Sequence, residues 1–219
     1  MHPPPRKHKR IVAIKNILIF STLALLFSGI IAIFWQQELR YLLPTPVPRN
    51  YQPIAPEQPI DLTHHLDQPL SKPVLLHFFS ADCPCSRFNI DHFRYLVNRY
   101  RDSIDFYVVL PGENTPEVAA QFQNQYDLTL PVLIDRDEQL ARVCGVYSTP
   151  QAAVVTAQSQ LYFRGNYNRA RYCTDRGTSY AELAIKALQR GAPPPYFAEL
   201  ATQSYGCQLP SHQRNFIWF

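Results

Sequence analysis

A long uncharged apolar run near the N-terminus constrains this chain more than any other feature of its sequence. No residue from Ile17 to Trp35 is acidic or basic, and most are aliphatic or aromatic. At a rise of about 1.5 Å per residue, a helix of roughly 20 residues crosses the hydrocarbon core of a bilayer. We therefore expect residues 17–35 to form a single transmembrane anchor.

A cluster of basic residues precedes this run, within residues 1–16. They are Arg6, Lys7, Lys9, Arg10 and Lys15. Because positive charge is retained on the cytoplasmic side of a membrane, we expect residues 1–16 to be a cytoplasmic tail. Everything after Trp35 is then extracytoplasmic, and periplasmic if the protein is bacterial.

A cleavable signal peptide is the alternative interpretation of the same run. Signal sequences have a shorter apolar region of about 7–15 residues, which ends in an Ala-x-Ala-like site. The stretch from Gly29 to Trp35 contains no such site. We therefore expect an uncleaved anchor and a single-pass membrane protein.

Proline marks the boundary between this anchor and the rest of the chain. Within residues 36–59, prolines recur at short intervals from Pro44 to Pro59, a spacing that favours an extended, semi-rigid linker. We expect a folded domain over residues 60–191 and a C-terminal tail, residues 192–219, packed on it. The net charge of +4 resides largely in the N-terminal tail, so the sequence indicates no nucleic-acid partner.

Short apolar runs alternate with amphipathic stretches through the domain. The expected strands are 74–79, 104–110, 131–134, 151–156 and 161–164, and the expected helices are 84–101, one that begins at Thr115, 137–143 and 178–190. This alternation predicts an α/β sheet with helices on both faces and an antiparallel portion contributed by the last two strands.

The sequence Cys83-Pro84-Cys85-Ser86 lies where the first of these strands passes into a helix. The unpaired N–H groups and the positive dipole end of a helix N-terminus stabilise a thiolate, which is the form that attacks disulfides and binds soft metals. In an extracytoplasmic compartment, disulfides also persist. We therefore take Cys83 and Cys85 as the candidate catalytic residues, with Cys83 as the attacking thiolate and Cys85 as the resolving thiol.

The segment from His77 to Ser86 resembles the active-site loop of the thioredoxin superfamily, in which a strand and a small-residue turn precede Cys-x-x-Cys. Ser148-Thr149-Pro150, followed by an apolar strand, is similar to the cis-proline loop of that superfamily. The resemblance covers residues 60–190 and is nearest to the extracytoplasmic redoxin branch, whose extra helix–strand insertion would be supplied by residues 104–134. It implies a thioredoxin-like sheet, a cis bond before Pro150, and a substrate-binding role for Thr149 and Pro150.

One departure from the pattern limits what the resemblance implies about activity. Aligning Cys83 with the nucleophile places Ser86 where the resolving cysteine of the family stands, and Cys85 comes one residue early. A Cys83–Cys85 disulfide would close a very small ring, and strained disulfides are more easily reduced. The direction of electron flow therefore does not follow from the family.

Three cysteines remain after Cys83 and Cys85 are taken as the redox pair. We expect Cys173 and Cys207 to form a structural disulfide that ties the proline-rich C-terminal tail to the domain, although one of them could instead be a second-site thiol near the active centre. Cys144 is expected to be a buried, inert thiol, which is the usual state of a cysteine outside a disulfide.

The sequence therefore favours a membrane-anchored thiol–disulfide oxidoreductase whose partners are thiol or disulfide substrates. Two alternatives stay open. Thiolates with His64, His65 or His77 would suit a copper or zinc chaperone, and a redoxin-type thiol peroxidase would need a Thr-x-x-Cys loop, where this chain has Ser80. No metal-ligand spacing and no phosphate-binding or hydrolase motif is present, so we expect no resident metal and no cofactor.

The membrane topology is directly testable with reporter fusions placed just after Trp35. We expect a reporter that works only outside the cytoplasm to be active at this junction, because the basic residues precede the apolar run. Activity of a cytoplasm-only reporter at the same junction would contradict the predicted topology.

Overall fold

The computed structural model describes residues 6–37, 43–66, 68–113, 115–170 and 172–212. Parts of three expected segments therefore lie outside the described residues, namely 1–5 of the cytoplasmic tail, 38–42 of the linker and 213–219 of the C-terminal tail. The chain divides into two compact units, Met1–Leu43 and Pro44–Phe219, which are described separately.

The first unit is a single helix, α1, over Arg6–Gln37. Its portion Ile11–Gln36 has a mean hydropathy of 2.6 and is long enough to cross a membrane. The apolar side chains of this portion are exposed all round the helix. A helix that is apolar on every side requires either a protein core or a lipid environment, so this helix meets the length and composition requirements of a membrane span.

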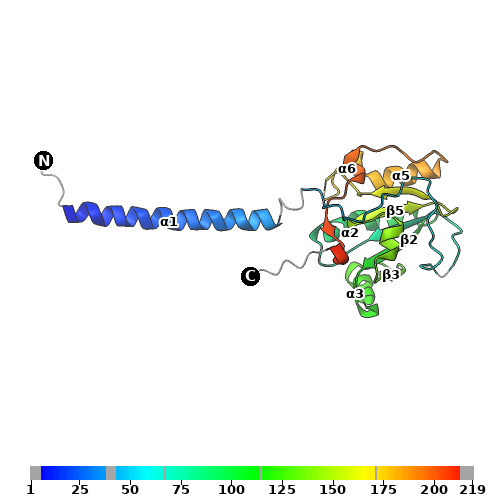
Figure 1. Cartoon of the computed structure of the whole chain (residues 1–219), viewed down its shortest axis with the longest axis horizontal. Helices are drawn as coiled ribbons and strands as arrows, with labels where there is room; N and C mark the ends of the chain where they lie inside the picture. Colours follow the sequence, from blue (N-terminus) through cyan, green and yellow to red (C-terminus); the bar gives the residue numbers. More distant parts are fainter. Residues whose placement is uncertain (1–5, 38–42, 67, 114, 171, 213–219) are drawn as a thin grey trace. The chain divides into compact units, whose positions relative to one another are not determined.

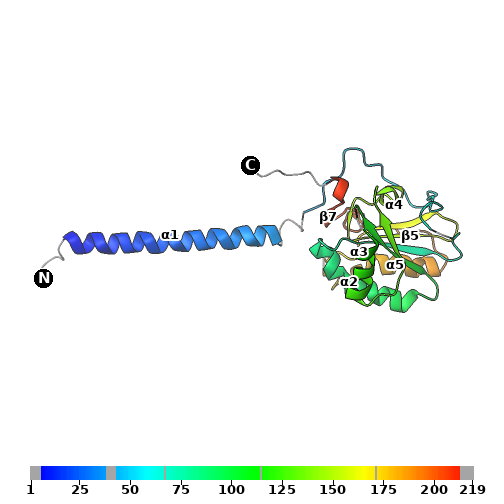
Figure 2. The same cartoon turned by 90° about the horizontal axis from the view of Figure 1, so that it is seen from below.

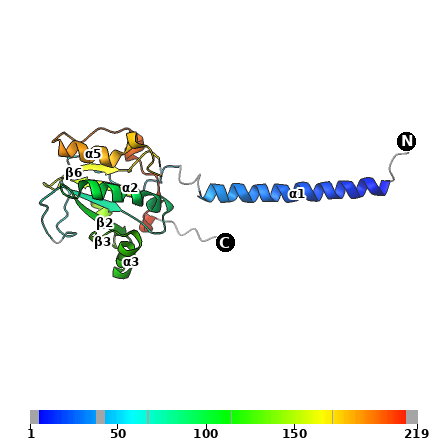
Figure 3. The same ribbon diagram turned by 180° about the vertical axis from the view of Figure 1, so that it is seen from behind.

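The second unit is built on a five-stranded sheet with the strand order β3-β2-β1-β5-β6 (Figures 1 and 3). The strands are β1 (Val74–Phe78), β2 (Asp105–Pro111), β3 (Val132–Asp135), β5 (Gln151–Val155) and β6 (Leu161–Gly165). β1, β2 and β3 are parallel, whereas β5 is antiparallel to β1 and β6 to β5. Every residue of the central strand β1 is buried, which agrees with its sequence, apolar except for His77.

Alternate residues of β1 face two separate hydrophobic cores. Leu75 belongs to a core shared with α2 (Pro84–Tyr100), α3 (Pro116–Tyr126) and α5 (Tyr180–Gln189). Leu76 belongs to a second core with the short helix α4 (Gln139–Val143) and apolar residues of the segment 54–70. Figure 2 shows α4 on the opposite side of the sheet from α2 and α5.

This topology is the thioredoxin-like fold expected from the sequence. The unit β1–α2–β2 is parallel, α3 and β3 follow β2 along the chain, and the β5–β6 hairpin leads to α5. The peptide bond between Thr149 and Pro150 is cis, as predicted. The expected strands and helices match the observed ones to within about two residues at most ends, because each carries a clear apolar period.

The linker predicted over residues 36–59 packs on the domain from residue 44 onward. Thr45 is buried and its amide donates to the Ser204 carbonyl at 2.8 Å, while the Tyr51 hydroxyl donates to the Gly145 carbonyl at 2.9 Å. Ile54 packs on the second core. Residues 44–59 are therefore part of the domain surface, because the apolar and hydrogen-bonding residues between the prolines find partners there.

The structure also contains short elements that the sequence does not predict. These are β4 (Ser148–Thr149), η2 (Arg176–Thr178), α6 (Glu199–Thr202), β7 (Cys207–Gln208) and η3 (Pro210–His212). Elements of two to four residues carry no readable period. In the C-terminal segment, α6 lies against β6, and the Asn166 backbone amide donates to the Ala201 carbonyl at 2.8 Å.

The close contact between α6 and β6 leads to a stability prediction. A Cβ at Gly165 would lie 2.2 Å from the Ala201 carbonyl oxygen, so Gly165→Ala forces two backbones apart. We expect the free energy of unfolding, measured in urea on the detergent-solubilised chain, to fall by about 1–3 kcal/mol. Gly177→Ala is the matched control, because its Cβ would meet only the Asp175 side chain, at 3.3 Å. Equal stability of the two variants would contradict the observed packing of α6.

Candidate active site

Cys83 occupies the N-cap position of α2, directly after the turn that follows β1. Its backbone is extended and its amide donates to the Ser80 carbonyl at 3.1 Å. Pro84 opens the first helical turn, where its missing N–H has no cost. The turn is braced from the helix, since the Ser80 amide donates to Ser86 Oγ and Arg87 Nη1 donates to the Ala81 carbonyl. The sulfur of Cys83 is thereby held at the positive end of a helix dipole.

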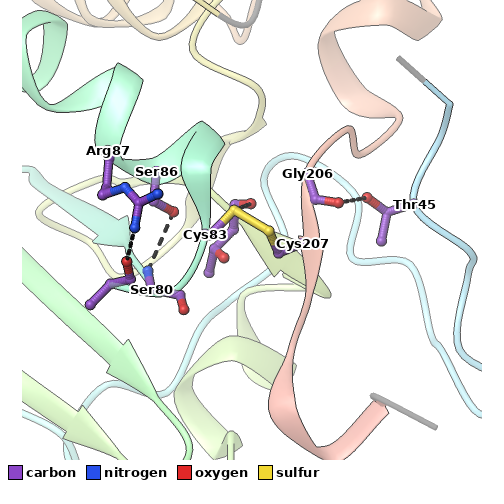
Figure 4. The surroundings of a disulfide bond; sticks show 9 residues. Thr45, Ser80, Cys83, Ser86, Arg87, Gly206 and Cys207 are labelled. Carbon is purple, nitrogen blue, oxygen red and sulfur yellow. Dashed lines mark hydrogen bonds between the residues drawn. A yellow bond between two sulfur atoms is a disulfide. The ribbon is translucent and has the colours of Figure 1, made fainter. Parts of the chain in front are cut away.

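The sulfur of Cys83 is bonded to Cys207, with the two Cα atoms 5.8 Å apart (Figure 4). The expected Cys173–Cys207 bond is therefore wrong, because Cys173 lies outside the disulfide. Cys83 is likewise not bonded to Cys85 in this structure. Local spacing favours a bond between Cys83 and Cys85, whereas the path of the tail carries Cys207 across the domain to the start of α2.

The tail reaches Cys83 as a short strand beside the cis-proline loop. β7 pairs antiparallel with β4, and Cys207 lies opposite Thr149. The Cys83 sulfur is 3.3 Å from the Thr149 carbonyl oxygen. The predicted substrate-binding residues Thr149 and Pro150 are thus brought beside Cys83, and the backbone of Thr149 is paired with the chain's own tail.

Gly206 permits this close approach. A Cβ at this position would lie 2.2 Å from the Thr149 carbonyl oxygen and 3.6 Å from Pro150 Cδ. No side chain fits between the two backbones at that distance. The glycine before Cys207 therefore has a structural reason.

Residues on both sides of Cys207 fix the tail to the domain. Ser204 is fully buried, and its hydroxyl accepts from Gln151 Nε2 at 2.7 Å. The Thr45 hydroxyl donates to the Gly206 carbonyl at 3.2 Å (Figure 4). Further along, Leu209 is buried in the second core and the Ser211 amide donates to Glu138 Oε1 at 2.8 Å. As a result Cys83 has no exposed surface, whereas Cys207 is half-buried.

A pocket of about 250 Å³ opens beside the turn that precedes Cys83. Its apolar wall includes Phe79, Phe122 and Tyr126, whose rings contact one another. Asp82 from the turn and Pro210 from the tail also line it. The pocket therefore lies next to the disulfide and is bounded on one side by the segment that carries Cys207.

Two further cysteines, Cys85 and Cys173, lie at α2 outside the disulfide. Cys85 is buried in the first turn of α2. Cys173 is half-buried, and its sulfur accepts a hydrogen bond from Asn89 Nδ2 at 3.0 Å. Cys144, at the end of α4, is completely buried, as expected, and burial raises the pKa of its thiol.

The histidines do not assemble with these thiols. His77 is fully buried in β1, where its ring stacks on Phe93 and its Nδ1 lies 2.7 Å from the Tyr167 hydroxyl. Burial lowers the pKa of His77 to about 3, so the ring is neutral at physiological pH. Within the described residues, no three His, Cys, Asp or Glu side chains form a group that could hold a metal ion. His64 and His65 lie in a turn of the segment before β1.

Comparison with known proteins identifies the fold and a family. A family model described as a domain of unknown function (DUF6436) matches residues 54–209. A hypothetical protein from Sinorhizobium meliloti 1021 aligns with a TM-score of 0.55 at 20% identity, covering 64% of this chain and 80% of its own. An uncharacterized conserved protein from Geobacillus kaustophilus aligns with a TM-score of 0.57 at 17% identity, covering 75% and 97%. These two likenesses show the fold. No curated protein matches the chain.

The contact between Gly206 and Thr149 predicts that one added methyl group, in Gly206→Ala, disfavours the Cys83–Cys207 disulfide. Gly206→Ala pushes β7 away from β4, so forming the Cys83–Cys207 bond then requires distortion of the tail. We expect the equilibrium constant for its formation in a glutathione buffer to fall by about fivefold to 150-fold, from an overpacking cost of about 1–3 kcal/mol. Gly177→Ala should leave this constant unchanged, and a wild-type constant for Gly206→Ala would show that the tail does not sit against Thr149.

Proposed function

This chain belongs to the DUF6436 family, and we propose that it is a thiol–disulfide oxidoreductase in which Cys83 exchanges disulfides and Cys207 is its partner. The observation that carries the proposal is the disulfide itself, which joins the N-terminus of α2 to the tail beside the cis Thr149–Pro150 bond. A sulfur at a helix N-terminus is a good leaving group, because its thiolate is stabilised there.

Exchange with a substrate dithiol proceeds in two balanced steps. A substrate thiolate attacks Cys83 Sγ, the bond to Cys207 breaks, and Cys207 leaves as a thiolate that takes up a proton. The second substrate thiol then attacks the mixed disulfide at the substrate sulfur, and Cys83 leaves as a thiolate. The substrate has lost two electrons and two protons, and the protein holds two thiols. The same steps in reverse reduce a substrate disulfide.

The surroundings of the disulfide support a protein or peptide substrate. Because Cys83 has no exposed surface, attack on its sulfur requires the tail around the half-buried Cys207 to move aside. Movement of the tail exposes the backbone of Thr149, which now pairs with Cys207. The neighbouring pocket, with its aromatic wall of Phe79, Phe122 and Tyr126, offers a place for an apolar side chain of the substrate.

The apolar helix α1 supports an attachment of this domain to a membrane. We place the basic residues before it in the cytoplasm and the cysteine domain outside, where a disulfide persists. Both the compartment and the anchor belong to the proposal, and the length and composition of Ile11–Gln36 are what favour them.

Cysteine variants of the full chain in detergent test the proposed activity. With a fluorescent dithiol peptide as substrate, we expect Cys83→Ser to abolish exchange. In Cys207→Ser, the Cys83 thiolate should attack a disulfide-bonded form of the peptide and release the other peptide sulfur as a thiol. The mixed disulfide on Cys83 should then stay trapped, because the sulfur that would displace the peptide is gone. Cys144→Ser is the matched control, since this buried thiol lies outside the disulfide, and it should exchange at the wild-type rate. Wild-type exchange by the Cys83 and Cys207 variants would refute the proposal.

A further inference from the structure

A second pair of thiols lies behind the disulfide, on the buried side of α2. Cys85 and Asn89 are four residues apart, so their side chains are neighbours on one face of the helix, and both are buried. The sulfur of Cys173 accepts a hydrogen bond from Asn89 Nδ2 at 3.0 Å. The side chain of Asn89 thus holds Cys173 against the face of α2 that also carries Cys85.

The loop that carries Cys173 is fixed in this position. Cys173 has a left-handed backbone, with φ at 54°, and its amide donates to the Ala170 carbonyl at 2.8 Å. The neighbouring Tyr172 ring contacts Phe88 of α2, with 4.7 Å between centroids. A non-glycine residue in this conformation is held there by its surroundings, so the approach of Cys173 to α2 is a built feature of the loop.

The environment of this second pair differs from that of Cys83. The pKa of Cys173 is raised to about 11, mainly by burial. The Asn89 hydrogen bond lowers this pKa, and a charge on Cys85 contributes to the rise. The fully buried Tyr167 also faces Cys173, and its pKa is raised by burial first and by a charge on Cys173 second. Cys83, by contrast, lies at the positive end of α2.

We propose that Cys85 and Cys173 form a second dithiol–disulfide pair, which passes two electrons to the Cys83–Cys207 bond. This inference rests on the proposed function, because it supplies a second redox pair for the same site. It also assigns a role to the unusual Cys-Pro-Cys spacing, in which the second cysteine faces the interior of the domain rather than the substrate.

The transfer is balanced within the chain and needs no external oxidant. The Cys85 thiolate attacks Cys83 Sγ, and Cys207 leaves and takes up the proton that Cys85 lost. The Cys173 thiolate then attacks Cys85 Sγ, and Cys83 leaves and takes up the second proton. One disulfide has been broken and one formed. The Cys83–Cys85 bond between these steps closes a very small ring, which makes it short-lived.

The chemistry of the leaving groups sets the direction of this transfer. A thiol of low pKa leaves a disulfide readily, and a thiol of high pKa leaves it slowly. The transfer releases Cys83 at a helix N-terminus and engages Cys173 in a buried setting where its charged form is disfavoured. Oxidation therefore moves from the outer pair, Cys83 and Cys207, to the inner pair, Cys85 and Cys173. The inner disulfide is the harder one to reduce.

The test follows both disulfides in the full chain in detergent. The fully reduced protein receives one equivalent of diamide under argon, and samples are quenched with acid, alkylated, digested without reductant and mapped by mass spectrometry. We expect the Cys83–Cys207 link first, and its loss should match the appearance of a Cys85–Cys173 link. In graded glutathione buffers, the inner pair should be half-oxidised at a [GSH]²/[GSSG] ratio at least about tenfold higher than the outer pair.

Variants separate the possible outcomes. Cys173→Ser should stop the transfer and extend the lifetime of the Cys83–Cys85 link, whereas Cys144→Ser should change neither disulfide. The inference is overturned if Cys85 and Cys173 stay reduced in wild-type protein under conditions that fully oxidise Cys83 and Cys207. If instead the Cys85–Cys173 link forms while Cys83–Cys207 never exchanges with glutathione, the proposed function and the transfer both fail, and only the inner pairing stands.

Discussion

The structure of the site depends on one close approach, in which the tail meets the Thr149–Pro150 peptide and bonds to Cys83. Gly206 allows the two backbones to touch, β7 pairs with β4, and Cys207 reaches the N-cap of α2. Contacts on either side, from Ser204 to Gln151 and from Ser211 to Glu138, hold the tail in place. The disulfide therefore joins α2 and β7, which are far apart in sequence and meet beside the cis-proline loop.

The same contact determines which molecules can reach the reactive sulfur. The tail covers Cys83, and Pro210 of the tail lines the neighbouring pocket. The Thr45 hydroxyl binds the tail at the Gly206 carbonyl. Breaking the Cys83–Cys207 bond removes a covalent restraint on this cover. Under the proposed function, reduction of the Cys83–Cys207 bond therefore also helps to expose Cys83, because this bond holds the tail over it.

Most of the fold was predictable from the sequence, and most of the site's connectivity was not. The strand before Cys83 and the helix after it carry apolar periods and a proline at the first turn, which are local signals. The cis bond before Pro150 followed from a family resemblance rather than from the residues alone. The partner of Cys207 depends on the three-dimensional path of the tail. The strand that carries Cys207 is two residues long, and no local sequence pattern predicts that path. The linker prediction was wrong for residues 44–59 for a related reason. Their prolines indicate extended chain, and extended chain can pack on a surface as well as span a gap.

The central claim is the pairing of Cys83 with Cys207, and mass-spectrometric mapping tests it most directly. The full chain, isolated without reductant and alkylated before digestion, should yield a cross-linked peptide that contains Cys83 and Cys207, and this peptide should separate on reduction. A cross-link between Cys173 and Cys207, or between Cys83 and Cys85, as the main product of the isolated protein would contradict this pairing.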